Sequence, residues 1–524
     1  MWRAYYHFYV TSTDLAFIQE HARQLHTASE SLPIWNQSPF GAYLKFTTEA
    51  TLTEVRRIWL SYAQTRSSQE DSESRHAINL VFDTHYNTSE SRPSIVGHGV
   101  RSAGAHGLWA TPQLNDAFHA FWRTGVVAGN RKDVSALSQD GGGRVNPLMA
   151  ISPVPSSKYN VHYGSDPLLG FHLAEHFDLA SQAADVGMES LALLVKSQFS
   201  KWCQTFISCV ASRTINIMHH CGEAINFAHA LQAIKGSDTL SPLTRHYVKP
   251  WSAVPLSLPS TLFTAYHVID TSNVIDHVGI LSLLPAIVPL LSEVCGSVLY
   301  TESLLQGAEE SQNFLSTVLH SDVTMSSLVF GVAPVGYLLG TMTDSTHIEH
   351  LLEMSLVKGR QKQYRMRLPW RRAAQGDLEV LKLMHGSGGS ASYRLNMDPH
   401  ELAAYFMQVY LAMFRESEDI SIKLEVLKRM MATPLVNDLG FCSRLSIVAL
   451  FATAKRTIST DWKVCIGELV SMIENNRSLM ISSSSLQELY LHLHASDLWS
   501  AETFMVEPRA QLNPWGRMRP PGES

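Results

Sequence analysis

The chain has 524 residues, of which 45% are hydrophobic and 17% are charged, and its formal net charge is −6. This length predicts about two to four domains, the apolar content excludes a wholly disordered chain, and an acidic total excludes a strongly basic nucleic-acid binder. None of the six cysteines forms a CxxC pair, so we expect reduced thiols in a cytoplasmic or nuclear protein and no zinc knuckle or disulfide framework.

Two segments bear on secretion and membrane insertion. The N-terminal run MWRAYYHFYV lacks a basic region followed by an apolar core and a small-residue cleavage site, so it does not match a secretory signal. The most apolar stretch, Val278 to Leu291, contains one serine and two prolines, and it is shorter than the roughly 20 residues that a membrane span needs. We therefore predict a buried helix there and no membrane partner.

Residues 1–200 form the first predicted region, which we interpret as a helical and irregular insertion. Helical periodicity covers residues 13–66, and the polar stretch at 67–75 is predicted to be a loop. Residues 76–200 are rich in Gly, Ser and His and are expected to be irregular until a helix begins at about 178 and runs to about 209.

Residues 201–375 alternate short apolar strands with amphipathic helices. Strands are predicted at 214–218, 265–269 and 297–300, with helices at 223–234 and near 279–292. Strands that alternate with helices predict βαβ units and a parallel sheet. We therefore expect an α/β fold with a Rossmann-like core, in which these three strands are neighbours and their carboxyl ends gather at one rim.

The chain beyond this core is predicted to be helical. A linker at 376–391 carries the run GSGGS, a helical region spans 392–507, and a loose tail spans 508–524. Asp398, Pro399 and Glu401 stand in the order of an N-cap, a first-turn proline and an acidic third residue, which predicts a helix start.

The segment Lys358–Arg372 is basic. Apolar and basic residues alternate across 364–368, which predicts a half-buried strand with one charged face. That face is either solvated or a surface for an anion or an acidic partner. A nucleic-acid partner is not expected, because the chain as a whole is acidic.

Candidate ligand-binding residues follow two of the predicted strands. The run VIDTSN at 268–273 and the run IMHHCGEA at 217–224 each pass from an apolar strand through a polar turn into a helix. Ligands of open α/β sheets bind at the carboxyl ends of strands. The candidates are Glu223, Asp270, Ser272, Asn273 and Asp276; each could instead cap a turn or complement a helix dipole.

A competing pattern lies earlier in the chain. His172, Glu175 and His176 match H-x-x-E-H, the inverted zinc-peptidase motif. On an α-helix the two histidines would share one face, as two zinc ligands must. A zinc peptidase is a remote alternative, because the sequence identifies no third ligand.

Several runs resemble a known family. VHYGSDPLLGFHLAEHF (161–177), HVIDTSNVIDHVGILSLL (267–284), SVLYTESLL (297–305), QYRMRLPW (363–370) and SLQELYLHLH (485–494) are similar to fungal domain-of-unknown-function proteins related to the N-terminal domain of the third dynein axonemal assembly factor. Some relatives also carry a MYND-type zinc finger, which has no counterpart here. The resemblance implies a class I methyltransferase-like fold interrupted by a long helical insertion.

The resemblance also bears on a cofactor. In such relatives a glycine-rich turn and a following acidic residue face S-adenosylmethionine, and both precede the motif that corresponds here to residues 2–8. The chain therefore lacks a counterpart of that turn, and we expect it to bind no cofactor by itself, with S-adenosylmethionine expected if the first half were restored. Glu223 falls where such folds place an adenine-contacting acid, and Asp270 falls near the motif after the fourth strand.

Two functions remain open from the sequence. The leading hypothesis is a non-catalytic methyltransferase-like protein that acts through protein partners, in interaction or assembly. The alternative is an S-adenosylmethionine-dependent methyltransferase truncated at its N-terminus.

Overall fold

The computed structural model describes fourteen stretches of the chain and two single residues. These are residues 1–64, 67–86, 99–127, 142–150, 166–177, 188–235, 245–249, 252–256, 265–294, 296–306, 314–338, 364–372, 394–419 and 444–500, with Val134 and Leu137. The predicted linker at 376–391 and the predicted tail at 508–524 lie outside the described residues.

The described chain is a mixed α/β protein with extensive helix and small sheets, and it forms two compact units. The first unit continues past the predicted boundary at residue 200 to Gly222, because a strand after that boundary pairs within it. The second unit begins at Glu223 and takes in the described helices beyond residue 394. Those helices are not a separate region, since they share one hydrophobic core with the sheet of that unit.

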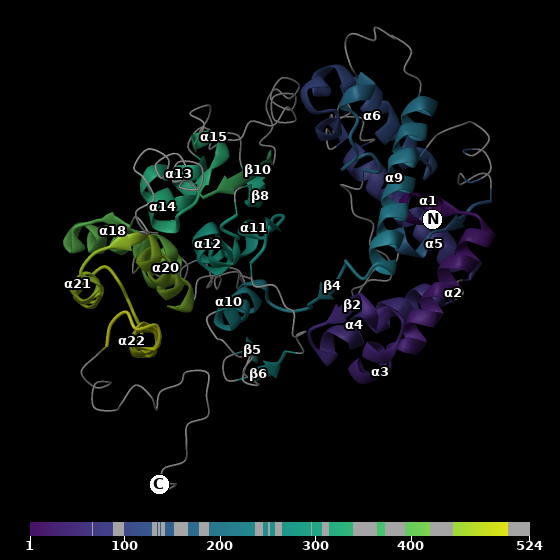
Figure 1. Ribbon diagram of the computed structural model, residues 1–524. Coiled ribbons are helices and arrows are strands. Elements are labelled where there is room, and N and C mark those ends of the chain that lie inside the picture. The colour runs from purple at the N-terminus through teal and green to yellow at the C-terminus, as the bar shows by residue number, and fades with distance from the viewer. Residues whose placement is uncertain are drawn as a thin grey trace, which may run out of the picture. The chain divides into compact units, whose positions relative to one another are not determined.

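Helices dominate the first unit (Figure 1). Its strands form two short pairs: β1 (Tyr9–Val10) is antiparallel to β3 (Arg144–Val145), and β2 (Leu44–Phe46) is parallel to β4 (Ile217–His219). Its helices are α1 (Trp2–Tyr6), α2 (Ser12–Ala28), α3 (Leu32–Gln37), η1 (Phe40–Ala42), α4 (Glu49–Ala63), α5 (Ser68–Tyr86), η2 (Gly99–His106), α6 (Gly107–Thr124), α8 (Pro147–Ala150), η4 (Ala174–Phe177) and α9 (Met188–Ala211).

The N-terminal segment is part of the core of this unit. Phe8 is fully buried and stacks on Phe121 with their ring centroids 4.8 Å apart. The Asn146 side chain donates hydrogen bonds to the backbone oxygens of Ala4, at 2.7 Å, and His7, at 2.8 Å. A buried amide that satisfies two backbone carbonyls fixes the turn between α1 and β1 against the start of α8.

The polar stretch at 67–75 is not the predicted loop, because all but its first residue belong to α5. Ser67 and Glu70 form a reciprocal capping pair: Ser67 Oγ accepts from the Glu70 amide at 3.2 Å, and the Glu70 carboxylate accepts from the Ser67 amide at 2.9 Å. This capping box satisfies two of the orphan donors of the first turn. The expectation of irregular structure after residue 76 was likewise wrong where α5 continues to Tyr86 and where α6 forms. The helix predicted from about 178 to about 209 is confirmed by α9, which is described from Met188.

The second unit contains a four-stranded sheet with the order β7-β8-β10-β9. β7 (Val268–Asp270) is parallel to β8 (Val298–Gln306), and β10 (Tyr364–Arg371) is antiparallel to both β8 and β9 (Ala333–Pro334). The β7, β8 and β9 strands therefore run in one direction, and β10 lies between β8 and β9 and runs in the opposite direction. Two further pairs are β5 (Arg245–Lys249) with β6 (Ser252–Pro255), and β11 (Leu395–Asn396) with β12 (Ile458–Ser459).

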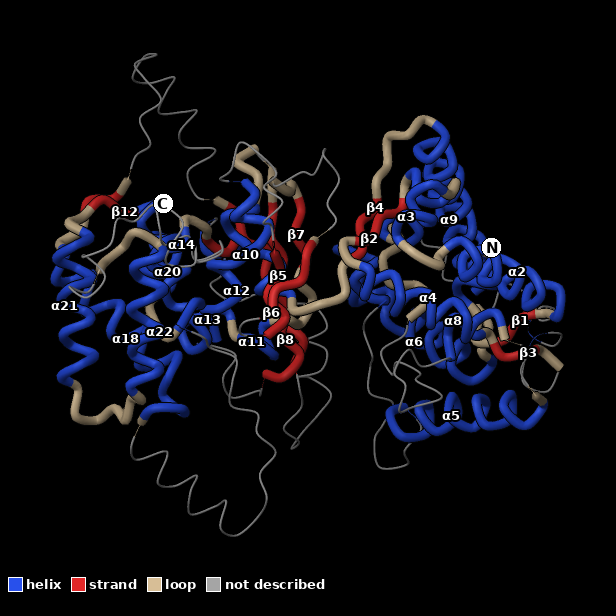
Figure 2. Tube along the Cα trace, turned by 90° about the horizontal axis from the view of Figure 1, so that it is seen from below, coloured by secondary structure: helices blue, strands red, loops and turns tan. Residues whose placement is uncertain are grey.

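The prediction that the strands at 214–218, 265–269 and 297–300 are neighbours was wrong for the first of the three. The first forms as β4, but it pairs with β2 of the first unit, whereas β7 and β8 pair with each other in the second (Figure 2). An apolar run three residues long can pair with any strand of suitable register, so its partner is chosen by tertiary packing. The carboxyl ends of β7 and β8 do lie at one rim.

Helices pack around this sheet. They are α10 (Ala224–Lys235), α11 (Ile275–Val278), α12 (Ile280–Ile287), η6 (Val288–Leu290), α13 (Phe314–Leu319), α14 (Val323–Phe330), α15 (Val335–Leu338), α18 (Pro399–Glu418), α20 (Arg444–Thr457), α21 (Trp462–Asn475) and α22 (Ser483–Ala495). Every residue of α12 is buried, which confirms the buried helix predicted from its apolar run. Among the described residues, none of the helices has the length and apolarity that crossing a bilayer requires.

Candidate functional site

The predicted rim residues occupy a tight turn at the carboxyl end of β7. Asp270 ends the strand, and its Oδ1 accepts a hydrogen bond from the Ser272 amide at 2.9 Å. Ser272 has a φ of +47°, a conformation that few non-glycine residues adopt. The Glu302 amide donates to the Ser272 carbonyl at 3.0 Å, so the turn is tied to β8. The sequence thus predicts where this turn lies, and a backbone hydrogen bond from the neighbouring strand β8 stabilises it.

Side chains from three strands meet around that turn. Arg367 of β10 forms an ion pair with Asp270 at 2.5 Å, and its guanidinium lies 4.5 Å from the centroid of the Tyr300 ring of β8. Asp276, at the start of α11, accepts a hydrogen bond from the Ser303 hydroxyl at 2.7 Å. Both carboxylates therefore have partners supplied by the neighbouring strands.

The side-chain amide of Asn273 belongs to the same turn. Its Nδ2 lies 3.5 Å from His277 Nε2, and its Oδ1 lies 3.5 Å from the Ser272 hydroxyl. Contacts of this length are at the limit of hydrogen bonding. Asp270, Ser272, Asn273 and Asp276 are thus brought together, as predicted, in an arrangement that holds a turn, one of the roles left open from the sequence.

Glu223 lies on a different element. It is exposed and precedes α10, where its carboxylate accepts from the backbone amides of Ile225, at 3.1 Å, and Asn226, at 2.7 Å. An acidic side chain at this position satisfies orphan amides and complements the helix dipole. Its hydrogen bonds are therefore those of a helix cap.

The H-x-x-E-H residues do not lie on an α-helix. His172 is exposed and precedes η4, a single 3-10 turn that contains Glu175 and His176. At three residues per turn, an i and i+4 pair lies on different faces. No cluster of three or more potential metal ligands occurs in the part of the chain that the structure describes. The helical premise of the zinc-peptidase alternative is therefore wrong.

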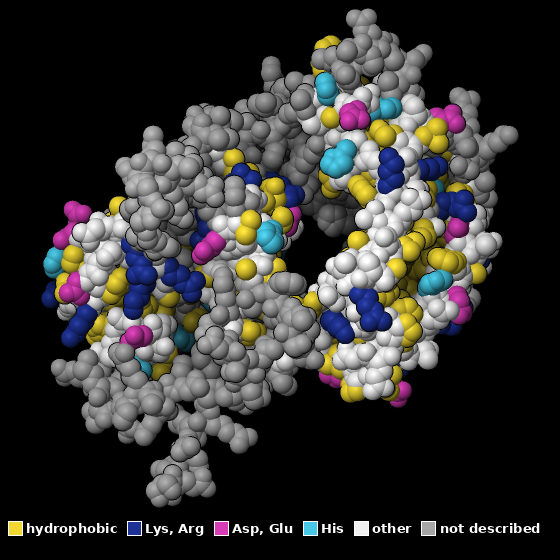
Figure 3. All heavy atoms as spheres, in the orientation of Figure 1, with side chains coloured by type: hydrophobic (Ala, Val, Ile, Leu, Met, Phe, Trp, Pro, Cys, Tyr) yellow, Lys and Arg dark blue, Asp and Glu magenta, His cyan; other side chains and the backbone are white. Residues whose placement is uncertain are grey.

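The predicted basic strand forms as β10. Leu368 and Trp370 are buried, whereas Arg371 is exposed and Arg367 half-buried, so the alternation of faces holds over the residues whose side chains are described. Residues 358–363 lie outside the described residues. Figure 3 shows charges of both signs mixed on the visible face of each unit.

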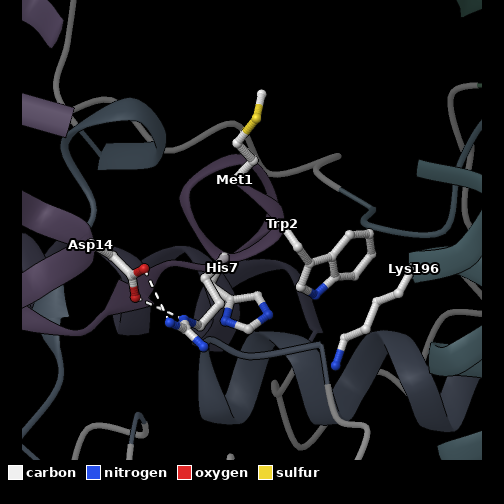
Figure 4. Close-up of a pocket in the computed structure, with 6 residues that line it drawn as sticks. Met1, Trp2, His7, Asp14 and Lys196 are labelled. Carbon is white, nitrogen blue, oxygen red and sulfur yellow. Dashed lines mark hydrogen bonds and ion pairs between the residues drawn. The ribbon is translucent and has the colours of Figure 1, made fainter. Parts of the chain in front are cut away.

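The first unit contains a pocket that the sequence did not single out. It has a volume of about 280 Å³ and is lined by Met1, Trp2, Arg3, His7, Asp14 and Lys196 (Figure 4). Met1 precedes α1, and the other lining residues come from α1, the turn after it, α2 and α9. The run of aromatic residues at the N-terminus was the available signal, but periodicity cannot tell which of its polar atoms face a cavity.

Comparisons with known proteins give no match: no family model, no curated protein and no solved structure is significantly similar to the chain.

Proposed function

We propose that this chain is a non-catalytic methyltransferase-like protein that acts by binding an extended segment of a protein partner. A Rossmann-like core is supported by the parallel strands β7 and β8 with α11 and α12 between them in the chain. A non-catalytic role is supported by the rim, where the carboxylates of Asp270 and Asp276 bond to Arg367 and Ser303. The resemblance to dynein assembly-factor proteins is part of the same proposal and agrees with a role in assembly.

The observation that carries this proposal is the edge of β7. Within the described residues, β7 pairs with β8 on one side and has no strand on the other, where a bridge between Tyr266 and Leu291 ends just before β7 begins. The His267 carbonyl and the Thr271 amide form hydrogen bonds to β8. In a parallel ladder alternate residues bond to the same neighbouring strand, so the backbone amides and carbonyls of Val268 and Asp270 face away from β8. The Val268 side chain is 60% exposed, although valine is a strand former that is usually buried.

An uncovered strand edge specifies the kind of partner that fits it. Unpaired amides and carbonyls in a row are satisfied by the backbone of another extended segment, which is the basis of recognition by strand addition. Side chains of the added strand would lie beside those of β7, and Val268 favours an apolar neighbour. We therefore infer a short extended peptide with an apolar residue opposite Val268.

The test uses a phage-displayed library of random seven-residue peptides, selected on the purified chain. We expect selected peptides to bind the wild-type protein and to lose affinity at least about tenfold, about 1.4 kcal/mol, against Val268→Lys. A lysine on an edge strand opposes strand addition. Methylation of alternate backbone amides of the peptide should also abolish binding, because it removes the ladder donors.

The control is Val464→Lys. Val464 is 40% exposed and lies on α21, so the substitution adds the same charge at an exposed valine of another element of the same unit. Peptides that bind Val268→Lys as tightly as the wild type, or a selection that enriches none, would contradict strand addition. Micromolar binding of S-adenosylmethionine in calorimetry would contradict the non-catalytic assignment and favour the methyltransferase alternative.

A further inference from the structure

Helix α9 is a long helix of the first unit that leads into β4 (Figure 1). An apolar stripe runs along it at the i, i+3, i+4, i+7 spacing that is typical of a face packed against another element. The members of the stripe are Leu191, Ala192, Val195, Phe199, Trp202, Cys203, Phe206, Ile207 and Val210. The sequence of this helix therefore contains a packing face along nearly its whole length.

Only the first half of the stripe is buried. Val195 and Phe199 are 0% and 8% exposed and belong to a hydrophobic core of the first unit. Trp202, Phe206 and Ile207 are 43%, 41% and 62% exposed. The helix thus continues beyond the core on which it packs, and the second half of its packing face is open to solvent among the described residues. Exposed apolar side chains that are clustered, rather than scattered singly, mark interaction surfaces.

Two aromatic rings of the exposed half are held from one side. The Trp202 ring stacks on the Phe171 ring, with their centroids 4.8 Å apart and their planes 8° apart. The Phe206 ring meets the edge of the Tyr43 ring, with their centroids 6.4 Å apart. Each ring is therefore oriented by a neighbour in the same unit and keeps an exposed surface. Ordering such rings at an interface costs little additional side-chain entropy.

The exposed half of the stripe lies in a basic segment of the chain. Lys201 precedes Trp202, and Arg213 follows the end of the helix. The nearest acidic residues along the chain are Glu189 and Glu223. Neither of the two cations forms an ion pair among the described residues. The surface therefore combines apolar side chains with positive charge that the segment itself does not balance.

The spacing and the charge together specify what fits this surface. A helical stripe presents ridges and grooves into which the side chains of another α-helix fit. The stretch from Trp202 to Val210 spans about 12 Å, which matches roughly two to three turns of a second helix. A second copy of α9 would bring further cations and no acidic residue, so like charges would meet. A helix with acidic residues beside its apolar face is complementary.

We propose that the C-terminal half of α9 binds an amphipathic, acidic helix of a protein partner. Apolar side chains of that helix pack against Trp202, Phe206 and Ile207, and its acidic side chains pair with Lys201 and Arg213. This surface belongs to the first unit, whereas the β7 edge belongs to the second. The inference therefore goes beyond strand addition, and either proposal can fail without the other.

The first measurement asks whether the face is open in the full chain. Fluorotryptophan labelling gives one fluorine resonance for each indole, and the resonance of Trp202 is identified by its loss in Trp202→Phe. We expect a soluble gadolinium chelate to broaden it strongly, because the side chain is exposed. A Trp202 resonance that is broadened as little as the least affected indoles would overturn the proposal.

The binding probe is a phage-displayed library of three-heptad helical peptides. Leucine is fixed at the a and d positions, and Glu, Gln or Lys is allowed at the flanking e and g positions. Selection on the full chain should enrich glutamate at the flanking positions. The selected peptides should bind Val268→Lys as tightly as the wild type, which separates this surface from the strand edge. Enrichment of lysine, or of no peptide, would contradict the proposal.

A matched pair of variants tests the apolar contact. Ile207→Asn should weaken binding of the selected peptide at least about tenfold, because it removes a large apolar side chain from the contact. Leu193→Asn makes a similar change at a position that is 59% exposed, about four turns earlier on the same helix and outside the stripe, and should leave the affinity unchanged. Both positions are exposed, so both variants should keep the wild-type melting temperature. Equal affinities of the two variants would contradict the proposal.

A charge reversal tests the acidic character of the partner. Lys201→Glu should weaken the glutamate-flanked peptide at least about threefold at low ionic strength and strengthen its lysine-flanked counterpart. Unchanged affinities for both peptides would overturn the charge requirement. Binding of the full chain to vesicles of phosphatidylcholine and phosphatidylserine, or self-association in sedimentation, that Ile207→Asn abolishes would assign the surface to a membrane or to a second copy and overturn the partner helix.

Discussion

A buried ion pair joins α18 to α20 in the second unit and provides a quantitative prediction. Arg444 is 6% exposed and Glu418 is 3% exposed, and their side chains form a direct ion pair. The Tyr410 hydroxyl lies between them, accepting from Arg444 Nη1 at 2.9 Å and donating to Glu418 Oε2 at 2.9 Å. Arg444 also lies 3.9 Å over the Phe414 ring, so its guanidinium is enclosed.

The perturbation is Glu418→Gln, which keeps the shape of the side chain and removes its charge. Arg444 would then be buried without its hydrogen-bonded counter-ion, and only the more distant charge of Glu488 would remain. Burial already opposes the charge of Arg444 and lowers its pKa. Breaking a buried pair in this way costs about 3–5 kcal/mol, because the remaining charge is desolvated without compensation. Glu418→Met combined with Arg444→Met removes both charges and should recover most of that loss.

Urea unfolding followed by circular dichroism, with Glu418→Gln, Arg444→Met and the double methionine variant, measures these free energies. The signature is non-additivity: each single variant loses several kcal/mol, and the double variant loses less than either. A loss below about 1 kcal/mol for Glu418→Gln would refute the reasoning, because that value is typical of an exposed pair whose charges reach water.

Two further predictions concern the first unit. In the folded chain burial lowers the pKa of His7 to about 3, whereas in the unfolded chain it is near 6.5, so the unfolded state binds more protons between these two pH values. The contribution of His7 to the free energy of unfolding should therefore fall by about 3 kcal/mol from pH 7 to pH 4. A His7→Leu variant that shows the same fall in urea unfolding would contradict this. Gly125→Ala should lower the free energy of unfolding by about 2–4 kcal/mol in thermal unfolding, because Gly125 has a φ of +72° and an added Cβ would lie 2.2 Å from the buried Tyr9 ring. Gly170 provides the control, because its φ is +90° and an added Cβ would have nothing within 4 Å. An equal loss in Gly170→Ala would show that the contact with the Tyr9 ring contributes nothing.

Local patterns predicted the elements whose cause is local. The helix start at Asp398 is present, with its carboxylate accepting from the amides of His400, at 2.9 Å, and Glu401, at 3.2 Å. The helix predicted at 223–234 forms as α10, and the alternation in β10 matches its burial where side chains are described. Caps, helical periodicity and strand alternation each depend on residues within one or two turns, so the sequence displays them directly.

Composition misled the prediction where a local signal was present but was not recognised. The polar segment at 67–75 contains the spacing of a capping box at Ser67 and Glu70, which starts α5. Asp71 in the same helix is 7% exposed and pairs with Arg144 at 2.8 Å. The burial of that charged side chain depends on a strand more than seventy residues away, so a polar helix resembled a loop.

The sequence by itself grouped Asp270, Ser272, Asn273 and Asp276, because one short turn after a strand carries all of them. Only the tertiary structure decided what they bond to, since Arg367 and Ser303 come from other strands of the sheet. Strand pairing was also beyond the sequence: the apolar run at 214–218 predicts a strand, but register and burial select its partner β2.

The same division holds for the burial of His7 and for the edge of β7 that has no strand beside it among the described residues. Composition and periodicity determined that His7 lies in an apolar segment and that Val268 lies in a strand. They did not determine that both ring nitrogens of His7 are buried without a hydrogen-bond partner among the described residues, or that Val268 stands at the edge of a sheet. Secondary structure follows from neighbours along the chain, whereas exposure, hydrogen-bond satisfaction and charge environment depend on residues that only folding brings together.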